Sequence, residues 1–302
     1  MVRSIGYVNG VVTDLADARI PVLDRGFLYG DSVYEVFRTY CGIPFLFDEH
    51  FDRLLNSAKL AGMIIPYSRE DIYAATHQAA MAAHADAGED IYVRYQITRG
   101  VGPIDLNPEA SQGSTLIVIV KAVPGRNPEH YDPGITLAVP ELRRNSINSL
   151  NPNIKSGNYL NNIIALAEAR KSGADDCLML DAAEQVTECS NSNCWFVLDN
   201  KVVTPEDGNL NGLTRRTLID LYGRAGIRVE LRPVQYEELE NATECFITSA
   251  TREVMPVARL KLLDGRCLHF ENGGGPRTRL AIGLYGEMVR EFVQTHETSR
   301  WH

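Results

Sequence analysis

The chain has 302 residues, enough to bury a sizeable core, and its length favours two domains over one. Its formal net charge of −9 at pH 7 argues against a surface that binds nucleic acid or an anionic membrane. No apolar run is long enough to span a bilayer, and the first residues lack the apolar centre of a signal peptide. Six cysteines without a Cys-x-x-Cys pair predict reduced thiols and a cytoplasmic location.

The first part of the chain predicts a β-rich domain with inserted helices. Its expected elements are a strand over 31–40, helices over 48–63 and 68–88, and strands over 90–100 and 114–123. Because side chains alternate along a strand, Tyr34, Val36 and Arg38 share one face of the first strand. By the same rule Arg94 shares a face of its strand with Tyr92.

The second part of the chain also mixes strands and helices. Strands are expected over 135–145, 176–181, 194–205 and 244–250, and helices over 160–171, 213–226 and 277–295. We place an interdomain linker at 123–133, around the Pro- and Gly-rich stretch PGRNPEHYDPG. The linker would separate a small domain, 1–122, from a larger domain, 134–302. Two α+β domains with a cleft between them are predicted.

Lys155 is the one lysine of six whose position has no ordinary explanation. The others are at positions 59, 121, 171, 201 and 261, which are predicted helices, a strand end, a turn and a loop flank. Lys155 instead lies in the segment NPNIKSGNYL, just before a predicted helix. A lysine that attacks a carbonyl must be partly desolvated, so that its amine is often neutral. The neighbourhood alone leaves a functional and a structural role equally open.

Two segments have the pattern of an anion site. Leu213 and Thr214 begin a predicted helix, where free N–H groups and the helix dipole favour a phosphate. The stretch TSATREV, 248–254, is a hydroxyl-rich turn after a predicted strand. Taken alone, the first segment is better explained as the start of an ordinary capped helix. Arg53 and Glu188 would each be unremarkable as solvated side chains.

Six segments taken in chain order resemble the signatures of the fold-type IV, or class IV, aminotransferases. They are DRGFLYGDSVYEVFR, HFDRLLNSA, IKSGNYLNNIIALAEA, VTECSNSN, NGLTRRT and TSATREVMPV. Members of this family use pyridoxal 5′-phosphate. The resemblance implies an α+β fold with a small N-terminal α/β domain and a larger, cofactor-binding C-terminal α/β domain, and with the cofactor at the cleft.

The resemblance also implies roles for individual residues. Lys155 resembles the lysine that binds the cofactor covalently and moves the proton during the reaction. Glu188 resembles the carboxylate that pairs with the pyridine nitrogen and keeps the ring protonated. Tyr159 resembles the tyrosine that is hydrogen-bonded to the phenolic oxygen of the cofactor. The implied phosphate site consists of Arg53, Leu213, Thr214, Ala250 and Thr251.

The signals for the substrate are mixed. D-amino-acid members of the family typically carry an Arg-x-His pair after TRG, and this chain has Ile104 and Leu106 there. The YVR stretch at 92–94 resembles the Tyr-x-Arg strand of branched-chain members. VYEVFR departs from their FEGxR pattern at Tyr34 and Val36 and is more typical of D-amino-acid members.

We predict an aminotransferase for branched-chain or similar hydrophobic L-amino acids with 2-oxoglutarate. The alternatives are a D-amino-acid or (R)-amine aminotransferase and a lyase of the aminodeoxychorismate type. A protein that binds the cofactor without turnover is disfavoured by the intact set Lys155, Tyr159 and Glu188. A homodimer is implied by the resemblance, and no metal, nucleic-acid or membrane partner is expected.

The predicted substrate site consists of Tyr29, Tyr34, Val36, Arg38 and Arg94. Arg94, helped by Tyr29 and Arg38, is predicted to pair with the γ-carboxylate of glutamate or 2-oxoglutarate, while Tyr34 and Val36 line the apolar side. An internal ion pair of Arg38 with Glu35 or Asp31 is the alternative for that arginine. Arg252, beside the predicted cofactor turn, either alters the substrate site or points outward.

Overall fold

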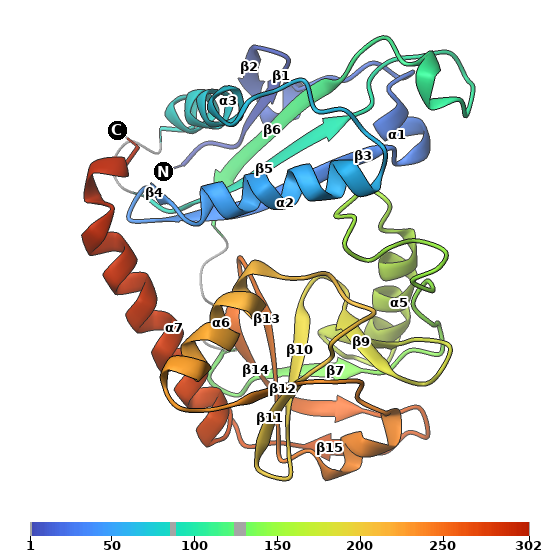
Figure 1. The fold of residues 1–302 in the computed structure, drawn as a ribbon, viewed down its shortest axis with the longest axis vertical. Helices are drawn as coiled ribbons and strands as arrows, with labels where there is room; N and C mark the ends of the chain where they lie inside the picture. The colour runs from blue at the N-terminus through green and yellow to red at the C-terminus, as the bar shows by residue number, and fades with distance from the viewer. Residues whose placement is uncertain (1, 85–88, 124–130, 302) are drawn as a thin grey trace. The chain divides into compact units, whose positions relative to one another are not determined.

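The computed structural model describes residues 2–84, 89–123 and 131–301, and the chain divides into two compact units (Figure 1). Unit 1 comprises Met1–Pro124, Ile154–Asn158 and Val289–His302, and unit 2 comprises Gly125–Asn153 and Tyr159–Met288. Most of the predicted linker, residues 124–130, lies outside the described residues. The predicted domains, 1–122 and 134–302, differ from these units because the chain returns to unit 1 twice.

Unit 1 is built on a six-stranded sheet in which every pairing is antiparallel. The strand order is β2-β1-β6-β5-β3-β4. The strands are β1 (Ile5–Val8), β2 (Val11–Asp14), β3 (Ser32–Tyr40), β4 (Ile43–Pro44), β5 (Ile91–Thr98) and β6 (Thr115–Ala122). The helices are α1 (Arg25–Tyr29), α2 (Phe47–Leu60) and α3 (Arg69–Ala82), with short 3-10 turns at Leu15–Asp17, Pro108–Ala110 and Glu297–Ser299.

One face of this sheet forms the core of unit 1. Alternation along β3 directs Val33 and Phe37 into an apolar cluster that includes Phe51 and Leu54 of α2. In α2 these side chains recur at helical spacing, so one side of the helix is apolar. The other face of β3 and β5 carries Tyr34, Arg38, Arg94 and Gln96, whereas Glu35 shares the core face with Val33 and Phe37.

Unit 2 is built on a nine-stranded mixed sheet in the order β12-β11-β10-β13-β14-β7-β8-β9, with β15 paired to β14. The strands are β7 (Ile135–Ala138), β8 (Asp176–Leu180), β9 (Val186–Cys189), β10 (Asn193–Leu198), β11 (Lys201–Thr204), β12 (Val229–Leu231), β13 (Glu244–Ser249), β14 (Glu253–Lys261) and β15 (Cys267–His269). The remaining elements are α5 (Leu160–Lys171), α6 (Leu213–Arg224), the 3-10 turn Tyr236–Asn241 and α7 (Pro276–Thr295), whose residues from Val289 on belong to unit 1. Residues 190–192 join β9 to β10, which contact each other although they are far apart in the strand order, so the sheet is curled.

Most predicted elements are confirmed, and the differences have local causes. The strand predicted over 135–145 ends at Ala138, shortly before Pro140, which has no N–H to donate. The strand predicted over 194–205 is the hairpin β10–β11, because Asp199 and Asn200 have positive φ angles of 49° and 61° and form its turn. The long predicted helix 68–88 ends as α3 at Ala82. Strands β1, β2, β4, β9, β12, β14 and β15 and helix α1 were not predicted.

Two sequence-distant segments complete unit 1. The first, Ile154–Asn158, lies along β3: Tyr34 N donates to Lys155 O (3.0 Å) and Gly157 N donates to Ser32 O (3.0 Å). The second is the C-terminal end of the chain, where the Trp301 indole is buried and donates to Tyr73 Oη (2.8 Å). A division by sequence position cannot find these returns, because both depend on long-range pairing.

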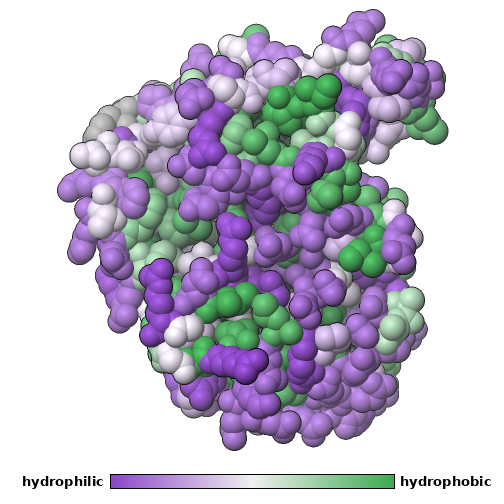
Figure 2. Space-filling model, in the orientation of Figure 1, coloured by the Kyte–Doolittle hydropathy of each residue, from purple (hydrophilic) through white to green (hydrophobic). Residues whose placement is uncertain are grey.

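The surface shown in Figure 2 is mostly hydrophilic, with apolar side chains exposed in patches between hydrophilic ones. Phe27 of α1 is 63% exposed, and Ile104 and Leu106 are 80% and 76% exposed. No helix within 2–84, 89–123 and 131–301 is long and apolar enough to cross a membrane. Over the same residues, no group of three or more His, Cys, Asp and Glu side chains could hold a metal ion.

Candidate functional site

Lys155 lies at the edge of the unit 1 sheet, with both main-chain polar groups engaged. Its carbonyl accepts the Tyr34 N–H, and its own N–H donates to Ser57 Oγ of α2 (3.2 Å). The side chain is half-buried, and its Nζ lies 4.6 Å from the centroid of the Tyr34 ring. This is cation–π distance, so the amine rests on an aromatic face and its position is set by two neighbouring elements.

The strand pairing brings the predicted substrate residues Tyr34, Val36 and Arg94 onto one face. In the register of β3 and β5, Tyr34 is opposite Gln96 and Val36 is opposite Arg94. The Arg94 guanidinium lies 3.6 Å from the Tyr34 ring centroid, and its Nη2 donates to Gln96 Oε1 (2.7 Å). Tyr34 therefore contacts two cationic side chains, Lys155 and Arg94.

Arg38 shares this face but has an acidic partner of its own. Its Nη2 lies 3.2 Å from Asp90 Oδ2, and its guanidinium lies 4.2 Å from the Tyr40 ring centroid. The predicted alternative of an internal ion pair is thus observed, with Asp90 as the partner instead of Glu35 or Asp31. Tyr29 ends α1, where the Arg25 guanidinium lies 5.1 Å from its ring.

Arg53 is held by a buried carboxylate. Its Nε and Nη2 donate to the two oxygens of Glu35, each at 2.7 Å, in a bidentate pair. Glu35 is fully buried and also contacts His50 Nδ1 at 2.7 Å. Arg53 is therefore not the solvated surface arginine that its helix position also allowed, and its guanidinium has a defined orientation.

The three side chains shift one another's pKa. Burial alone would raise the pKa of Glu35, but the charge and hydrogen bonds of Arg53 outweigh it and hold that pKa well below its ordinary value. Burial lowers the pKa of His50, and the hydrogen bond with Glu35 offsets only part of that effect. Glu35 is thus ionised and His50 is neutral at pH 7.

In unit 2 a second buried carboxylate is paired with an arginine. Glu188, predicted just past a strand, lies within β9 and is buried. Arg144 donates to its Oε1 from Nε (3.1 Å) and Nη2 (2.8 Å), and Leu210 N donates to its Oε2 (3.1 Å). Arg144 was missed in the sequence because its partner lies 44 residues away along the chain. Tyr159, the other predicted residue here, is the N-cap of α5.

The predicted phosphate residues of unit 2 lie at a helix start and at a hairpin turn. Gly212 caps α6 without a side-chain hydrogen bond, and Leu213 and Thr214 begin its first turn with buried side chains. The N–H groups of a first helical turn have no partner within the helix and can bind an anion. Ala250 and Thr251 are half-buried in the turn between β13 and β14. The buried Ser190 Oγ, between β9 and β10, has no hydrogen-bond partner among the described residues.

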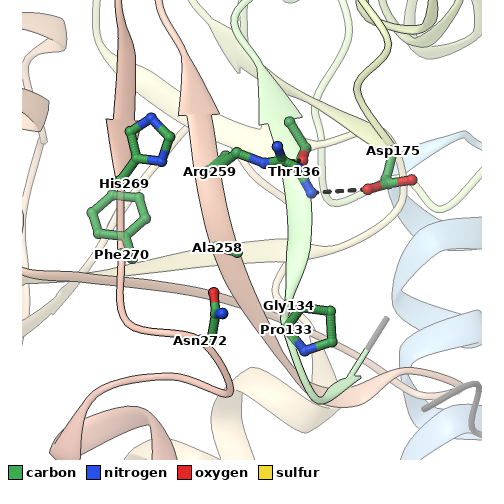
Figure 3. Close-up of a pocket in the computed structure, with 9 residues that line it drawn as sticks. All are labelled: Pro133, Gly134, Thr136, Asp175, Ala258, Arg259, His269, Phe270 and Asn272. Atoms are coloured by element: carbon green, nitrogen blue, oxygen red, sulfur yellow. Dashed lines mark hydrogen bonds between the residues drawn. The ribbon is translucent and has the colours of Figure 1, made fainter. Parts of the chain in front are cut away.

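A pocket of about 410 Å³ lies elsewhere in unit 2 (Figure 3). Thr136 of β7, Arg259 of β14 and His269 of β15 line it, and the Thr136 N–H donates to Asp175 Oδ2 (2.9 Å). None of the cofactor-binding or substrate-binding residues predicted from the sequence lines this pocket. It is therefore a feature separate from the candidate site.

Comparison with known proteins points to one family. The family described as Amino-transferase class IV matches residues 32–260. A Methanocaldococcus jannaschii protein provisionally named branched-chain-amino-acid aminotransferase is 34% identical over 270 residues, which cover 89% of this chain and 91% of that protein. A D-alanine aminotransferase from Listeria monocytogenes is 33% identical over 296 residues, which cover 95% of this chain and 96% of that enzyme.

Solved structures agree with this result. The branched-chain aminotransferase from Thermoproteus uzoniensis with norvaline superposes with a TM-score of 0.83 at 30% identity, covering 94% of this chain and 94% of that one. An aminotransferase from Brucella abortus bound to the cofactor PLP superposes with a TM-score of 0.81 at 26% identity, covering 95% and 99%. A further branched-chain amino acid aminotransferase, solved with pyridoxamine 5′-phosphate, has a TM-score of 0.84 at 29% identity, covering 95% and 94%.

Acidification is expected to destabilise unit 1 through Glu35 and His50. Both pKa values are lowered by folding, so on acidification the unfolded chain binds protons that the folded chain does not. The stabilisation is therefore complete above the ordinary His pKa of 6.5, and part of it is lost below that value. The rest is lost as the pH falls below the ordinary Glu pKa of 4.5. Calorimetric unfolding from about pH 8 to about pH 4 measures the expected fall in thermal midpoint.

Variants separate the two contributions. His50→Gln should flatten the upper part of the decline, because the group that titrates there is gone. His269→Gln, at an exposed position of β15, should leave the profile unchanged. Identical profiles for the wild type and His50→Gln would contradict the assignment.

Proposed function

The chain belongs to the class IV aminotransferases, and we propose that it binds pyridoxal 5′-phosphate through Lys155 to move an amino group between an amino acid and a 2-oxo acid. One observation carries the assignment to this lysine. Lys155 is half-buried, its main chain is bound to β3 and α2, and its amine lies 4.6 Å from the Tyr34 ring centroid. A nucleophilic lysine needs this partial desolvation and fixed position.

The residues present fit this cofactor. A pyridine nitrogen calls for a buried carboxylate, and Glu188 is buried. A phosphate calls for N–H donors, and the first turn of α6 at Leu213 and Thr214 has N–H groups without partners inside the helix and a glycine N-cap that has no side chain to bind them. The buried Ser190 hydroxyl, which has no partner among the described residues, is a further polar group that a ligand would satisfy.

Each residue has a physical task in this proposal. When bound, the cofactor supplies an electron sink for the negative charge that develops at the substrate Cα. Lys155, released from the cofactor by the incoming amine, would take the proton from the substrate Cα and return it to the cofactor carbon that first held the lysine nitrogen. Glu188 would hold a proton on the ring nitrogen by its negative charge, and Arg144 keeps that carboxylate in place through two hydrogen bonds. Arg53, fixed by Glu35, would contribute positive charge for the phosphate.

We propose that the substrates are hydrophobic L-amino acids, with branched-chain amino acids favoured, and 2-oxoglutarate. In support, Arg94 provides a cation for a second carboxylate and Val36, directly opposite, an apolar wall. A branched-chain amino acid aminotransferase that superposes with a TM-score of 0.83 at 28% identity has been solved with N-(5′-phosphopyridoxyl)-L-glutamate and with 4-methylvaleric acid, an acidic and an aliphatic ligand.

A D-amino-acid aminotransferase is the second candidate. The similarity to the Listeria monocytogenes D-alanine aminotransferase, at 33% identity over 95% of this chain, favours it. Ile104 and Leu106 argue against a D-amino-acid aminotransferase, because D-amino-acid members typically carry an Arg-x-His pair at these positions.

We also propose that the protein is a homodimer. Phe27 of α1 and Ile104 and Leu106 of a loop in unit 1 are exposed apolar side chains. Arg25 Nη1 of α1 donates to Asp105 O (2.6 Å), so the helix is bound to the loop that carries Ile104 and Leu106. Light scattering that gives a single chain mass of 33.6 kDa would contradict the dimer.

Lys155→Ala is expected to abolish amino transfer and covalent binding of the cofactor. In the wild type, borohydride reduction followed by peptide mass spectrometry should find the cofactor on Lys155. Lys171→Ala, at the exposed end of α5, is the matched control and should keep activity. A cofactor bound to any other lysine would overturn the assignment.

Glu188→Gln is expected to leave the cofactor bound but to slow proton transfer by about 100-fold, because a neutral amide does not stabilise a protonated ring nitrogen. Stopped-flow absorbance of the half-reaction measures this rate. Glu184→Gln is the control, since Glu184 also pairs with an arginine, Arg143, but its side chain is 43% exposed. Rates near the wild-type value for Glu188→Gln would assign the role to another group.

Arg94→Met is expected to weaken the 2-oxoglutarate half-reaction by about 10–100-fold and to affect leucine much less, because only the former loses a charge-assisted contact. Half-reactions with L-amino acids, D-amino acids and (R)-amines, followed by absorbance, give both the stereochemical preference and this comparison. Arg259→Met, at an exposed position of β14, should change neither half-reaction. Equal losses for leucine and 2-oxoglutarate would make Arg94 a structural residue.

A further inference from the structure

We infer that Arg252 and Asp176 form a positioning ion pair that holds the turn of Ala250 and Thr251 in register with the strand that carries Glu188. This inference rests on the proposed function, since it takes that turn as part of the phosphate site. Arg252 then neither enters the substrate site nor points outward, since its guanidinium pairs with Asp176.

The turn has a short, strained backbone. Ser249 and Glu253 are the last paired residues of β13 and β14, so residues 250–252 form the whole connection. Glu253 has a positive φ of 56°, a conformation that favours glycine over a residue with a side chain. Arg252 N donates to Ser249 Oγ (3.3 Å) across the turn. Contacts from outside the turn are needed to keep such a backbone in place.

Arg252 supplies those contacts at both of its ends. Its Nη1 lies 2.6 Å from Asp176 Oδ2 at the start of β8. Its carbonyl accepts a hydrogen bond from Tyr131 Oη (2.8 Å). The Asp176 carboxylate is fully buried, whereas the arginine side chain is 30% exposed. A buried carboxylate needs its partner far more than a surface carboxylate does, so the pair is held firmly.

The second oxygen of Asp176 extends the connection to the strand of Glu188. Asp176 Oδ1 accepts the N–H groups of Cys177 (2.8 Å) and Ser190 (3.2 Å). Ser190 follows Glu188 by two residues, and its carbonyl accepts a hydrogen bond from Asn162 Nδ2 of α5 (2.9 Å). One carboxylate thus joins the turn, the end of β9 and, through Ser190, the helix that follows Tyr159.

This arrangement makes Arg252 a positioning residue and not a ligand. Its guanidinium is turned to Asp176, so it acts on the cofactor by fixing the main chain of Ala250 and Thr251. The distance between the phosphate turn and the carboxylate for the ring nitrogen is then set within unit 2. A rigid cofactor binds more tightly when both ends of its site are already correctly spaced.

Four variants test this role: Arg252→Met, Asp176→Asn, the double variant, and Arg252→Lys. Two quantities are measured for each, namely the dissociation constant for pyridoxal 5′-phosphate, from titration of the apoprotein, and the thermal midpoint of the apoprotein. Arg252→Met should lower the midpoint, because it leaves Asp176 buried and unpaired. It should also weaken cofactor binding about tenfold or more.

The double variant separates positioning from stability. It should recover the apoprotein midpoint, since no buried charge is left unpaired, but it should not recover cofactor affinity. Arg252→Lys should recover part of the affinity by keeping one charged contact. Arg266→Met, which removes an exposed ion pair with Glu240 in the same unit, is the control and should keep wild-type affinity.

Unchanged cofactor affinity in Arg252→Met, or full recovery of affinity in the double variant, would overturn the inference and make the pair merely structural. The wild type distinguishes this failure from that of the proposed function. If wild-type protein carries the reduced cofactor on Lys155 while Arg252→Met binds equally well, the inference alone is wrong. If the wild type binds no pyridoxal 5′-phosphate, both are wrong.

Discussion

The pairing of residues 154–157 with the edge of β3 is the constraint on which the candidate site depends. Two main-chain hydrogen bonds, from Tyr34 N to Lys155 O and from Gly157 N to Ser32 O, place a segment from the middle of the sequence beside a strand near its beginning. The same pairing sets the Lys155 amine 4.6 Å from the centroid of the Tyr34 ring, which the Arg94 guanidinium also contacts, at 3.6 Å. A lysine in a free loop would have neither a fixed direction nor a partly desolvated amine.

Three buried carboxylates, each paired with an arginine, support the functional residues in the two units. Glu35 orients Arg53, Glu188 is held by Arg144, and Asp176 binds Arg252. An unpaired charge in such places would be strongly destabilising, whereas a pair with additional hydrogen bonds is tolerated and directional. Each pair fixes the direction of its two side chains, and removal of one partner would leave a buried charge unpaired.

Most features that depend on residues close together in the sequence were predicted correctly, and features that depend on residues far apart in the sequence were not. Helices α2, α5, α6 and α7 and strands β3, β5 and β6 were predicted because their periodicity is local. Strand β14 was missed because the stretch TSATREV, 248–254, was interpreted as a turn, although β14 already begins at Glu253. The return of the chain to unit 1 and the ion-pair partners Asp90, Arg144 and Asp176 were not predicted, because each depends on residues distant in sequence.

The sequence by itself determined the family, through six colinear segments, and singled out Lys155 and Glu188 as chemical candidates. It also determined which side chains of each strand share a face, because alternation is a property of the extended backbone. Tertiary structure alone decided that Tyr34 contacts both Lys155 and Arg94, that Arg38 is held by Asp90, and that Arg252 is held by Asp176. The physical reason is that strand register and burial determine which cation lies next to a carboxylate or an aromatic ring. Neither property can be read from the residues adjacent in the chain.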